Sequence, residues 1–126
     1  MRSLLLLLSI TAAHAAPPES FFRAIHEVET SGRTGAILGD GGKALGPLQI
    51  HREYWADSRV GGTYEMVADL EYAKRVAAAY LQRYAPKAWA AGDVETLARV
   101  HNGGPAGARK AATLSYAAKV KARISK

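Results

Sequence analysis

The sequence predicts a mostly helical α+β domain. Apolar side chains recur at intervals of three and four residues in most of the chain, which is the spacing of one face of an α-helix. One early interval differs, because six glycines stand between Gly32 and Gly46 around two short apolar triplets. That pattern is typical of a small β-hairpin or a compact loop. A chain of 126 residues is long enough for one domain with its own core.

The first residues have the order of a secretory signal peptide. Arg2 precedes the apolar run 4–10, and small residues follow up to Ala15. The apolar run is about half of the ~20 residues that a membrane-spanning helix needs, and an uncleaved N-terminal anchor is the alternative. We therefore expect residues 1–15 to be removed and residues 16–126 to form the domain. The mature protein is expected to be secreted or periplasmic, without stable membrane insertion.

Charge and composition exclude several classes of function. Lysine and arginine outnumber aspartate and glutamate by 17 to 11, which gives a formal net charge of +6 and favours anionic partners. For an exported protein, cell-wall polymers fit this charge better than nucleic acid, and no interleaving of basic and aromatic residues indicates a nucleic-acid binder. The chain has no cysteine, and its four histidines lack metal-ligand spacing. We expect no metal and no cofactor.

Helices are predicted in five segments. Pro47 suits the first turn of a short helix, Pro86 ends a long one, and Asp93 is a good N-cap. Apolar residues from Met66 to Tyr84 recur at helical spacing, so the long helix is expected to be the central one of the core. The predicted helical segments are 19–30, 47–55, 63–84, 93–100 and 113–124.

Glu29 is the first candidate for chemistry. In the first predicted helix it shares a face with Phe22 and Ile25, and it lies at the C-terminal end. Contact with hydrocarbon and the negative end of the helix dipole both favour a protonated carboxyl group, which a general acid requires. Glu27 stands four residues from Arg23 and is expected to stay ionised. The alternative is that both are ordinary surface glutamates.

Asp40 is the second candidate. It stands in the glycine-rich interval, where a hydrated backbone keeps a carboxylate ionised. One shielded acid beside one hydrated carboxylate is a division of labour suited to cleavage of a glycosidic bond. Because Asp-Gly is a common turn pair, the alternative is that Asp40 serves only the turn.

Five short motifs, in this order, resemble those of the invertebrate-type (destabilase-like) lysozymes. Single motifs of this kind are weak, but the ordered set is specific and spans residues 24–107. Members of that family are usually rich in cysteine, so the chain resembles a cysteine-free branch. The motifs are Val28-Glu29-Thr30-Ser31-Gly32, Asp40, Gly46-Pro47-Leu48-Gln49-Ile50, Tyr54-Trp55 and Arg99-Val100-His101-Asn102-Gly103-Gly104-Pro105-Ala106-Gly107.

The resemblance implies a lysozyme-like fold with a cleft between a helical lobe and a small β lobe. It implies a secreted antimicrobial muramidase that hydrolyses the β-1,4 bond between N-acetylmuramic acid and N-acetylglucosamine of bacterial peptidoglycan. Glu29 matches the family's acid and Asp40 its second carboxylate. We expect a monomer whose partner is the peptidoglycan glycan strand. The residues that match the substrate groove are Gln49, Ile50, Tyr54, His101 and Asn102.

Other interpretations of the same residues stay open. A lytic transglycosylase shares several of these motifs and needs only the glutamate, because a hydroxyl group of the substrate attacks. A non-catalytic wall-binding module would also suit the basic charge. Tyr54 fits a core position as well as a sugar platform, and His101 fits the end of a helix as well as the groove.

Overall fold

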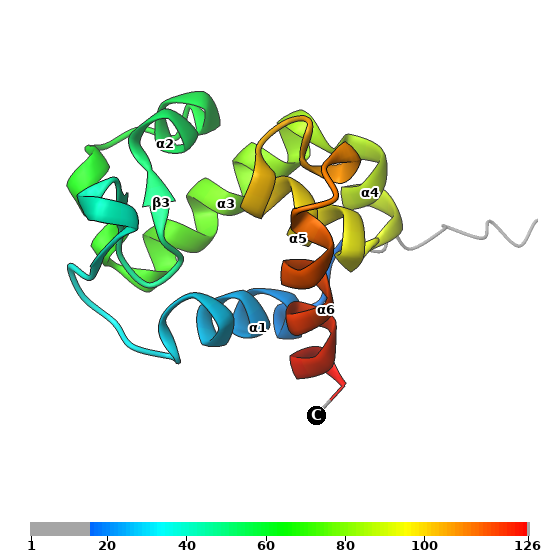
Figure 1. The fold of residues 1–126 in the computed structure, drawn as a ribbon. Coiled ribbons are helices and arrows are strands. Elements are labelled where there is room, and N and C mark those ends of the chain that lie inside the picture. The colour runs from blue at the N-terminus through cyan, green and yellow to red at the C-terminus, as the bar shows by residue number, and fades with distance from the viewer. Residues whose placement is uncertain (1–15, 126) are drawn as a thin grey trace, which may run out of the picture.

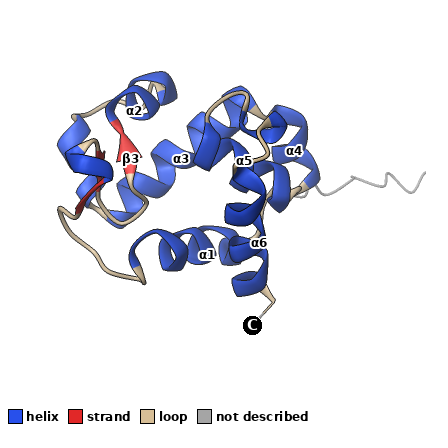
Figure 2. Cartoon of the chain, in the orientation of Figure 1, coloured by secondary structure: helices blue, strands red, loops and turns tan. Residues whose placement is uncertain are grey.

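Six α-helices and a three-stranded antiparallel sheet make up residues 16–125, the part of the chain that the computed structural model describes (Figures 1 and 2). The predicted signal peptide, residues 1–15, lies outside the described residues. In chain order the elements are α1 (Glu19–Thr30), β1 (Leu38–Gly39), the 3-10 helix η1 (Asp40–Gly42), β2 (Ala44–Leu45), β3 (Ile50–His51), α2 (Arg52–Ser58), η2 (Tyr64–Ala68), α3 (Leu70–Tyr84), α4 (Pro86–Ala91), α5 (Val94–Gly103), η3 (Gly107–Arg109) and α6 (Thr113–Ile124).

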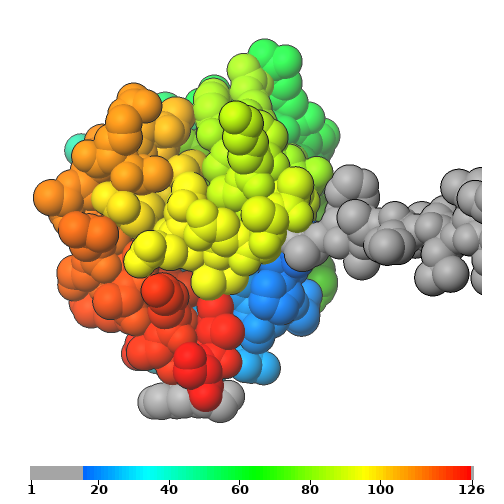
Figure 3. Space-filling view, turned by 90° about the vertical axis from the view of Figure 1, so that its right-hand side faces the viewer, coloured from blue at the N-terminus to red at the C-terminus, as the bar shows by residue number. Residues whose placement is uncertain are grey.

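The elements divide into two lobes. The helical lobe consists of α1 and α3 to α6, with α6 packed against both α5 and α1. Figure 3 shows its outer surface, where the C-terminal helix α6 lies beside the start of α1. The sheet lobe, residues 38–68, holds the three strands, and its helix α2 packs against α3. The predicted α+β fold class, mostly helical with a small hairpin, is therefore confirmed.

One apolar core joins the lobes. Phe21 and Ile25 of α1 are fully buried together with Leu48 and Ile50 of the sheet lobe and Leu97 of α5. Burial of large aliphatic and aromatic side chains of this kind is worth ~1.5–3 kcal/mol for each residue. Because the core crosses from one lobe to the other, it also fixes how the two lobes face each other.

The helix predicted from Pro47 is wrong at its start. Gly46 has a φ of 84°, and the chain turns there before Ile50 pairs with Leu45 as strand β3. The helix itself begins at Arg52. The fixed φ of proline suits both the first turn of a helix and a tight turn. Here the pairing of β3 with β2 selects the tight turn.

The long central helix is also shorter than predicted. Residues 64–68 form the 3-10 helix η2, and the chain is extended at Asp69, with φ −85° and ψ 127°. The Asp69 carboxylate accepts a hydrogen bond from the Tyr72 amide at 2.9 Å and caps α3. Met66, predicted to face the core, is 44% exposed.

The remaining predicted helices are present, with one addition, and α5 continues past its predicted end at Val100 to Gly103. Helices α1 and α6 have the predicted bounds, and the Asp93 side chain caps α5 by accepting from the Thr96 amide. Pro86 follows the end of α3 as predicted, but it also begins α4, a helix that the sequence did not predict. Within residues 16–125, no helix is both long and apolar enough to cross a lipid bilayer.

Candidate active site

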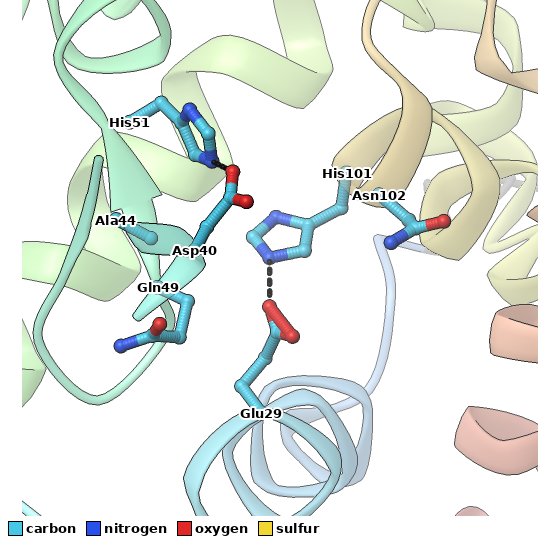
Figure 4. A pocket seen from close by; sticks show the side chains of 7 residues that line it. All are labelled: Glu29, Asp40, Ala44, Gln49, His51, His101 and Asn102. Atoms are coloured by element: carbon cyan, nitrogen blue, oxygen red, sulfur yellow. Dashed lines mark ion pairs between the residues drawn. The ribbon is translucent and has the colours of Figure 1, made fainter. Parts of the chain in front are cut away.

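A polar pocket of about 340 Å³ opens where the two lobes meet (Figure 4). Glu29 rises into it from α1, while Asp40 and His51 come from the sheet lobe and His101 from α5. The sequence predicted five of the lining residues as site residues. The full lining is Glu29, Asp40, Ala44, Gln49, His51, His101 and Asn102.

Glu29 is held at the last turn of α1. Ser31, two residues after Glu29, takes a left-handed conformation with a φ of 57° and ends the helix. The Thr30 hydroxyl donates to the Pro47 carbonyl oxygen at 2.9 Å, which fastens this end of α1 to the sheet lobe. The Glu29 side chain is only 20% exposed, so its carboxyl group is largely shielded from water.

His101 is the nearest charged or polar partner that the structure gives Glu29. Its Nε2 lies 3.6 Å from Oε2 of Glu29 and 3.3 Å from the Leu48 carbonyl oxygen. Its Nδ1 lies 2.9 Å from the Tyr54 hydroxyl. The imidazole is 2% exposed, so it is a wall of the pocket and offers little surface to a ligand.

Three tyrosines form an apolar wall behind these two groups. The Tyr54 ring stacks on Tyr80 with centroids 3.6 Å apart, and Tyr116 lies against the His101 ring. Burial raises the pKa of the Tyr54 phenol well above its ordinary value, and the nearby Tyr80 and Glu29 add to the effect. Burial also raises the pKa of Tyr116, again with a contribution from Glu29. The phenols therefore stay protonated beside the carboxyl group.

Asp40 lies in a contrasting environment. It follows strand β1 with a φ of 50°, a left-handed conformation that aspartate tolerates better than most residues. Its Oδ2 is 3.1 Å from Nε2 of His51, and its side chain is 65% exposed. The turn interpretation and the site interpretation of Asp40 both apply, because the residue begins η1 and lines the pocket.

Gln49 and Asn102 bring amide groups to the pocket. Gln49 has a φ of 53°, and its side-chain nitrogen donates to the carbonyl oxygens of Ile37 at 3.1 Å and Gly46 at 3.0 Å. Its amide oxygen remains for a further donor. Asn102 lies on the last turn of α5, beside His101.

Two predicted groove residues lie behind the pocket and do not line it. Ile50 is fully buried in the core, and Tyr54 is 8% exposed and reaches the site only through His101. Ala44 and His51 are the two lining residues that the sequence analysis missed, and only His51 brings a polar side chain. In an extended strand neighbouring side chains point to opposite faces, so the burial of Ile50 directs His51 toward the other face. The helix predicted there obscured this alternation.

The geometry suits acid catalysis. Glu29, which is largely shielded, and Asp40, which is exposed, line the same polar pocket as the side-chain amides of Gln49 and Asn102. Among the described residues, no group of three histidine, cysteine, aspartate or glutamate side chains is placed to hold a metal ion. Paired carboxyl groups with such different surroundings, set in a cleft between two lobes, are typical of a glycoside hydrolase.

Comparison with known proteins identifies the family. No protein-family model matches the chain. A lysozyme of Ostrea edulis is 36% identical over 116 residues, which cover 89% of this chain and 85% of that protein. The chain belongs to the invertebrate-type lysozymes.

Solved structures agree with the sequence comparison. The lysozyme of Tapes japonica superposes with a TM-score of 0.72 at 26% identity, covering 84% of this chain and 92% of that one. The lysozyme of Meretrix lusoria, solved in complex with Aeromonas hydrophila PliI, gives a TM-score of 0.72 at 28% identity, covering 84% and 89%. The two-lobed architecture is thus shared with lysozymes from two bivalves, although this chain has no cysteine.

Proposed function

We propose that this protein is a secreted muramidase that hydrolyses the β-1,4 bond between N-acetylmuramic acid and N-acetylglucosamine in bacterial peptidoglycan. One observation carries the proposal. Of two carboxyl groups that line one pocket, Glu29 is 20% exposed beside His101, whereas Asp40 is 65% exposed. Membership of the lysozyme family supports the same reaction class.

Each carboxyl group has one role in the reaction. Glu29 donates its proton to the glycosidic oxygen as the bond from that oxygen to the anomeric carbon breaks. Asp40 attacks the anomeric carbon or stabilises its positive charge. A water oxygen then bonds to that carbon, which breaks the bond to Asp40 where one has formed, and the water gives one proton to Glu29, which restores the acid. The amides of Gln49 and Asn102 bind polar groups of the sugar.

Charge and the N-terminal sequence support the substrate and its location. The full chain has a formal net charge of +6 and remains basic without Arg2, which draws the secreted protein toward an anionic cell-wall polymer. The order of residues 1–15 directs export of the protein. Outside the cell, an enzyme that cleaves peptidoglycan is antibacterial. Mass spectrometry of the secreted protein tests the export step, with a mature chain that begins at Ala16 as the expected result.

The main test compares three variants of the secreted protein on purified peptidoglycan. Glu29→Gln is expected to abolish the loss of turbidity while binding to the sediment persists. Asp40→Asn is expected to lower the rate by on the order of 100-fold or more. Glu27→Gln is the matched control, because Glu27 lies on the same helix, pairs with Arg123 at 3.8 Å and is outside the pocket. It is expected to keep full activity.

Product analysis separates the competing reactions. Reducing ends on the released fragments support hydrolysis, whereas 1,6-anhydro ends together with a fully active Asp40→Asn variant identify a lytic transglycosylase. A wild-type protein that binds peptidoglycan without releasing fragments would identify a wall-binding module. Either of the last two outcomes contradicts the proposal.

A further inference from the structure

The His101 ring is clamped more tightly than a residue that only lines a groove requires. Tyr54 meets the ring edge-on, with centroids 5.3 Å apart and planes at 78°, and Tyr116 lies against it at 6.3 Å and 27°. Only 2% of the side chain is exposed. A ring held on both sides cannot turn over, so each of its nitrogens keeps one fixed set of partners.

Those partners assign the proton on the ring. The Leu48 carbonyl oxygen beside Nε2 can only accept a hydrogen bond, so Nε2 carries the hydrogen, and the same nitrogen faces a Glu29 carboxyl oxygen. Nδ1 is then free to accept from the Tyr54 hydroxyl at 2.9 Å. Burial keeps the pKa of that phenol high, so Tyr54 remains a donor wherever the enzyme works. The hydrogen bond from Tyr54 to Nδ1 thus selects the His101 tautomer whose Nε2–H group faces Glu29.

We propose that Tyr54 and His101 form a positioning relay for the acid, in which Tyr54 fixes the His101 tautomer and the Nε2 hydrogen of His101 orients the Glu29 carboxyl group. This inference rests on the proposed role of Glu29. Since an N–H group faces Oε2, the proton that Glu29 transfers must be carried on Oε1. The relay therefore decides which oxygen of the acid delivers the proton.

The distances fit a relay that tightens during the reaction. At 3.6 Å the Nε2 to Oε2 separation is longer than a hydrogen bond, and the Leu48 carbonyl oxygen at 3.3 Å shares the donor. Catalytic contacts commonly shorten when substrate fills a site. Tyr54 itself is fixed by stacking on Tyr80, with ring planes only 12° apart, so the far end of the relay does not move.

A purely structural role for His101 would fit the same burial, so the test uses substitutions that separate the two roles. In His101→Gln the side-chain amide reaches the place of Nε2 and can still donate to Glu29, whereas in His101→Asn it reaches only the place of Nδ1. Tyr54→Phe removes the hydroxyl group alone. Tyr72→Phe is the matched control, because the Tyr72 hydroxyl donates to the Gly61 carbonyl oxygen at 2.9 Å, accepts from Nε1 of Trp55 at 2.9 Å and has no hydrogen bond to His101.

We expect Tyr54→Phe to lower kcat roughly tenfold and His101→Asn on the order of 100-fold, with KM changed by less than about twofold, since a small misplacement of a reacting group costs this much. His101→Gln is expected to keep more activity than His101→Asn at equal stability. Tyr72→Phe is expected to keep the wild-type kcat, although it loses two part-buried hydrogen bonds. Chemical denaturation of each variant shows which ones are folded under the assay conditions.

The nitrogen-15 chemical shifts of the His101 ring give a readout that folding alone does not move. The wild type is expected to show a protonated Nε2 and an unprotonated Nδ1 at the pH of the assay, and Tyr54→Phe a mixture of the two tautomers. A wild-type ring protonated at Nδ1 overturns the relay, as does a Tyr54→Phe variant with unchanged kcat. If Glu29→Gln is inactive while Tyr54→Phe and His101→Asn are fully active, only the relay is wrong. An active Glu29→Gln would instead refute the proposed function.

Discussion

A methyl group added at Gly39 tests how the Gln49 side chain is packed in the pocket. Its backbone is extended, with φ −142° and ψ 177°, a conformation open to any residue. A β-carbon built there would nevertheless overlap the side-chain oxygen of Gln49. The perturbation Gly39→Ala therefore tests a side-chain contact inside the pocket and leaves the backbone unstrained.

The magnitude follows from what Gln49 must give up. Its amide nitrogen donates to the carbonyl oxygens of Ile37 and Gly46, at 3.1 and 3.0 Å. Moving the side chain clear of the methyl group breaks both bonds, at about 1 kcal/mol each. Alanine in place of glycine returns about 0.4–1 kcal/mol by restricting the unfolded chain. We expect Gly39→Ala to lower the free energy of unfolding by about 1–1.5 kcal/mol.

The sign should reverse when Gln49 is absent. In a Gln49→Ala background nothing is left for the methyl group to displace, so adding Gly39→Ala should raise stability by about 0.4–1 kcal/mol. Urea denaturation of the four proteins of this cycle, followed by tryptophan fluorescence and circular dichroism, measures the coupling. An effect of Gly39→Ala that is equal in both backgrounds to within about 0.5 kcal/mol would refute the reasoning.

Three further predictions concern other groups of the site. The Tyr116 hydroxyl is buried without a hydrogen-bond partner among residues 16–125, so Tyr116→Phe should stabilise the fold by about 1 kcal/mol in urea denaturation, and a less stable variant would contradict this. Burial raises the pKa of Tyr80 from 10.0 to about 12. The Tyr80 hydroxyl therefore loses its proton at a lower pH in the unfolded chain than in the folded one, so stability should fall as the pH rises from 10 to 12. Tyr80→Phe should avoid up to about 3 kcal/mol of this loss, which denaturation at several pH values would measure. His51→Gln should lower kcat severalfold but shift stability by less than about 0.5 kcal/mol, because its pair with Asp40 is solvent-exposed. Arg52→Gln, which breaks a more exposed pair with Glu65, should leave kcat unchanged.

The helices that the sequence predicted best are those whose local signals agree. In α1 the buried Phe21, Phe22 and Ile25 recur at helical spacing, and in α5 the Asp93 cap precedes a buried Leu97. Where two local signals compete, pattern alone cannot choose between them. Helical periodicity runs through Asp69, but its side chain caps a new helix there and breaks the longer one.

The shielding of Glu29 could be predicted only in part. Its own helix supplies the apolar neighbour Ile25, which the sequence indicates. The groups that enclose the carboxyl group itself are His101 and the tyrosines behind it, Tyr54 and Tyr116, which are 25 or more residues away along the chain. Such contacts depend on how the lobes pack, and periodicity carries no information on that. Motif similarity located His101, but its bond to Tyr54 emerged only from the fold.

The burial of Ile50 in the core explains how the site keeps its shape in a chain without disulfides. Pocket residues alternate with residues anchored in the core: Gln49 stands between Leu48 and Ile50, both fully buried. His101 likewise follows Val100, which is 2% exposed. The backbone that presents each functional side chain is therefore fastened one residue away, by the same core that joins the two lobes. A substitution that shrinks Ile50 would thus alter the pocket by loosening the strand beneath it, since Ile50 itself has no surface with which to bind a sugar.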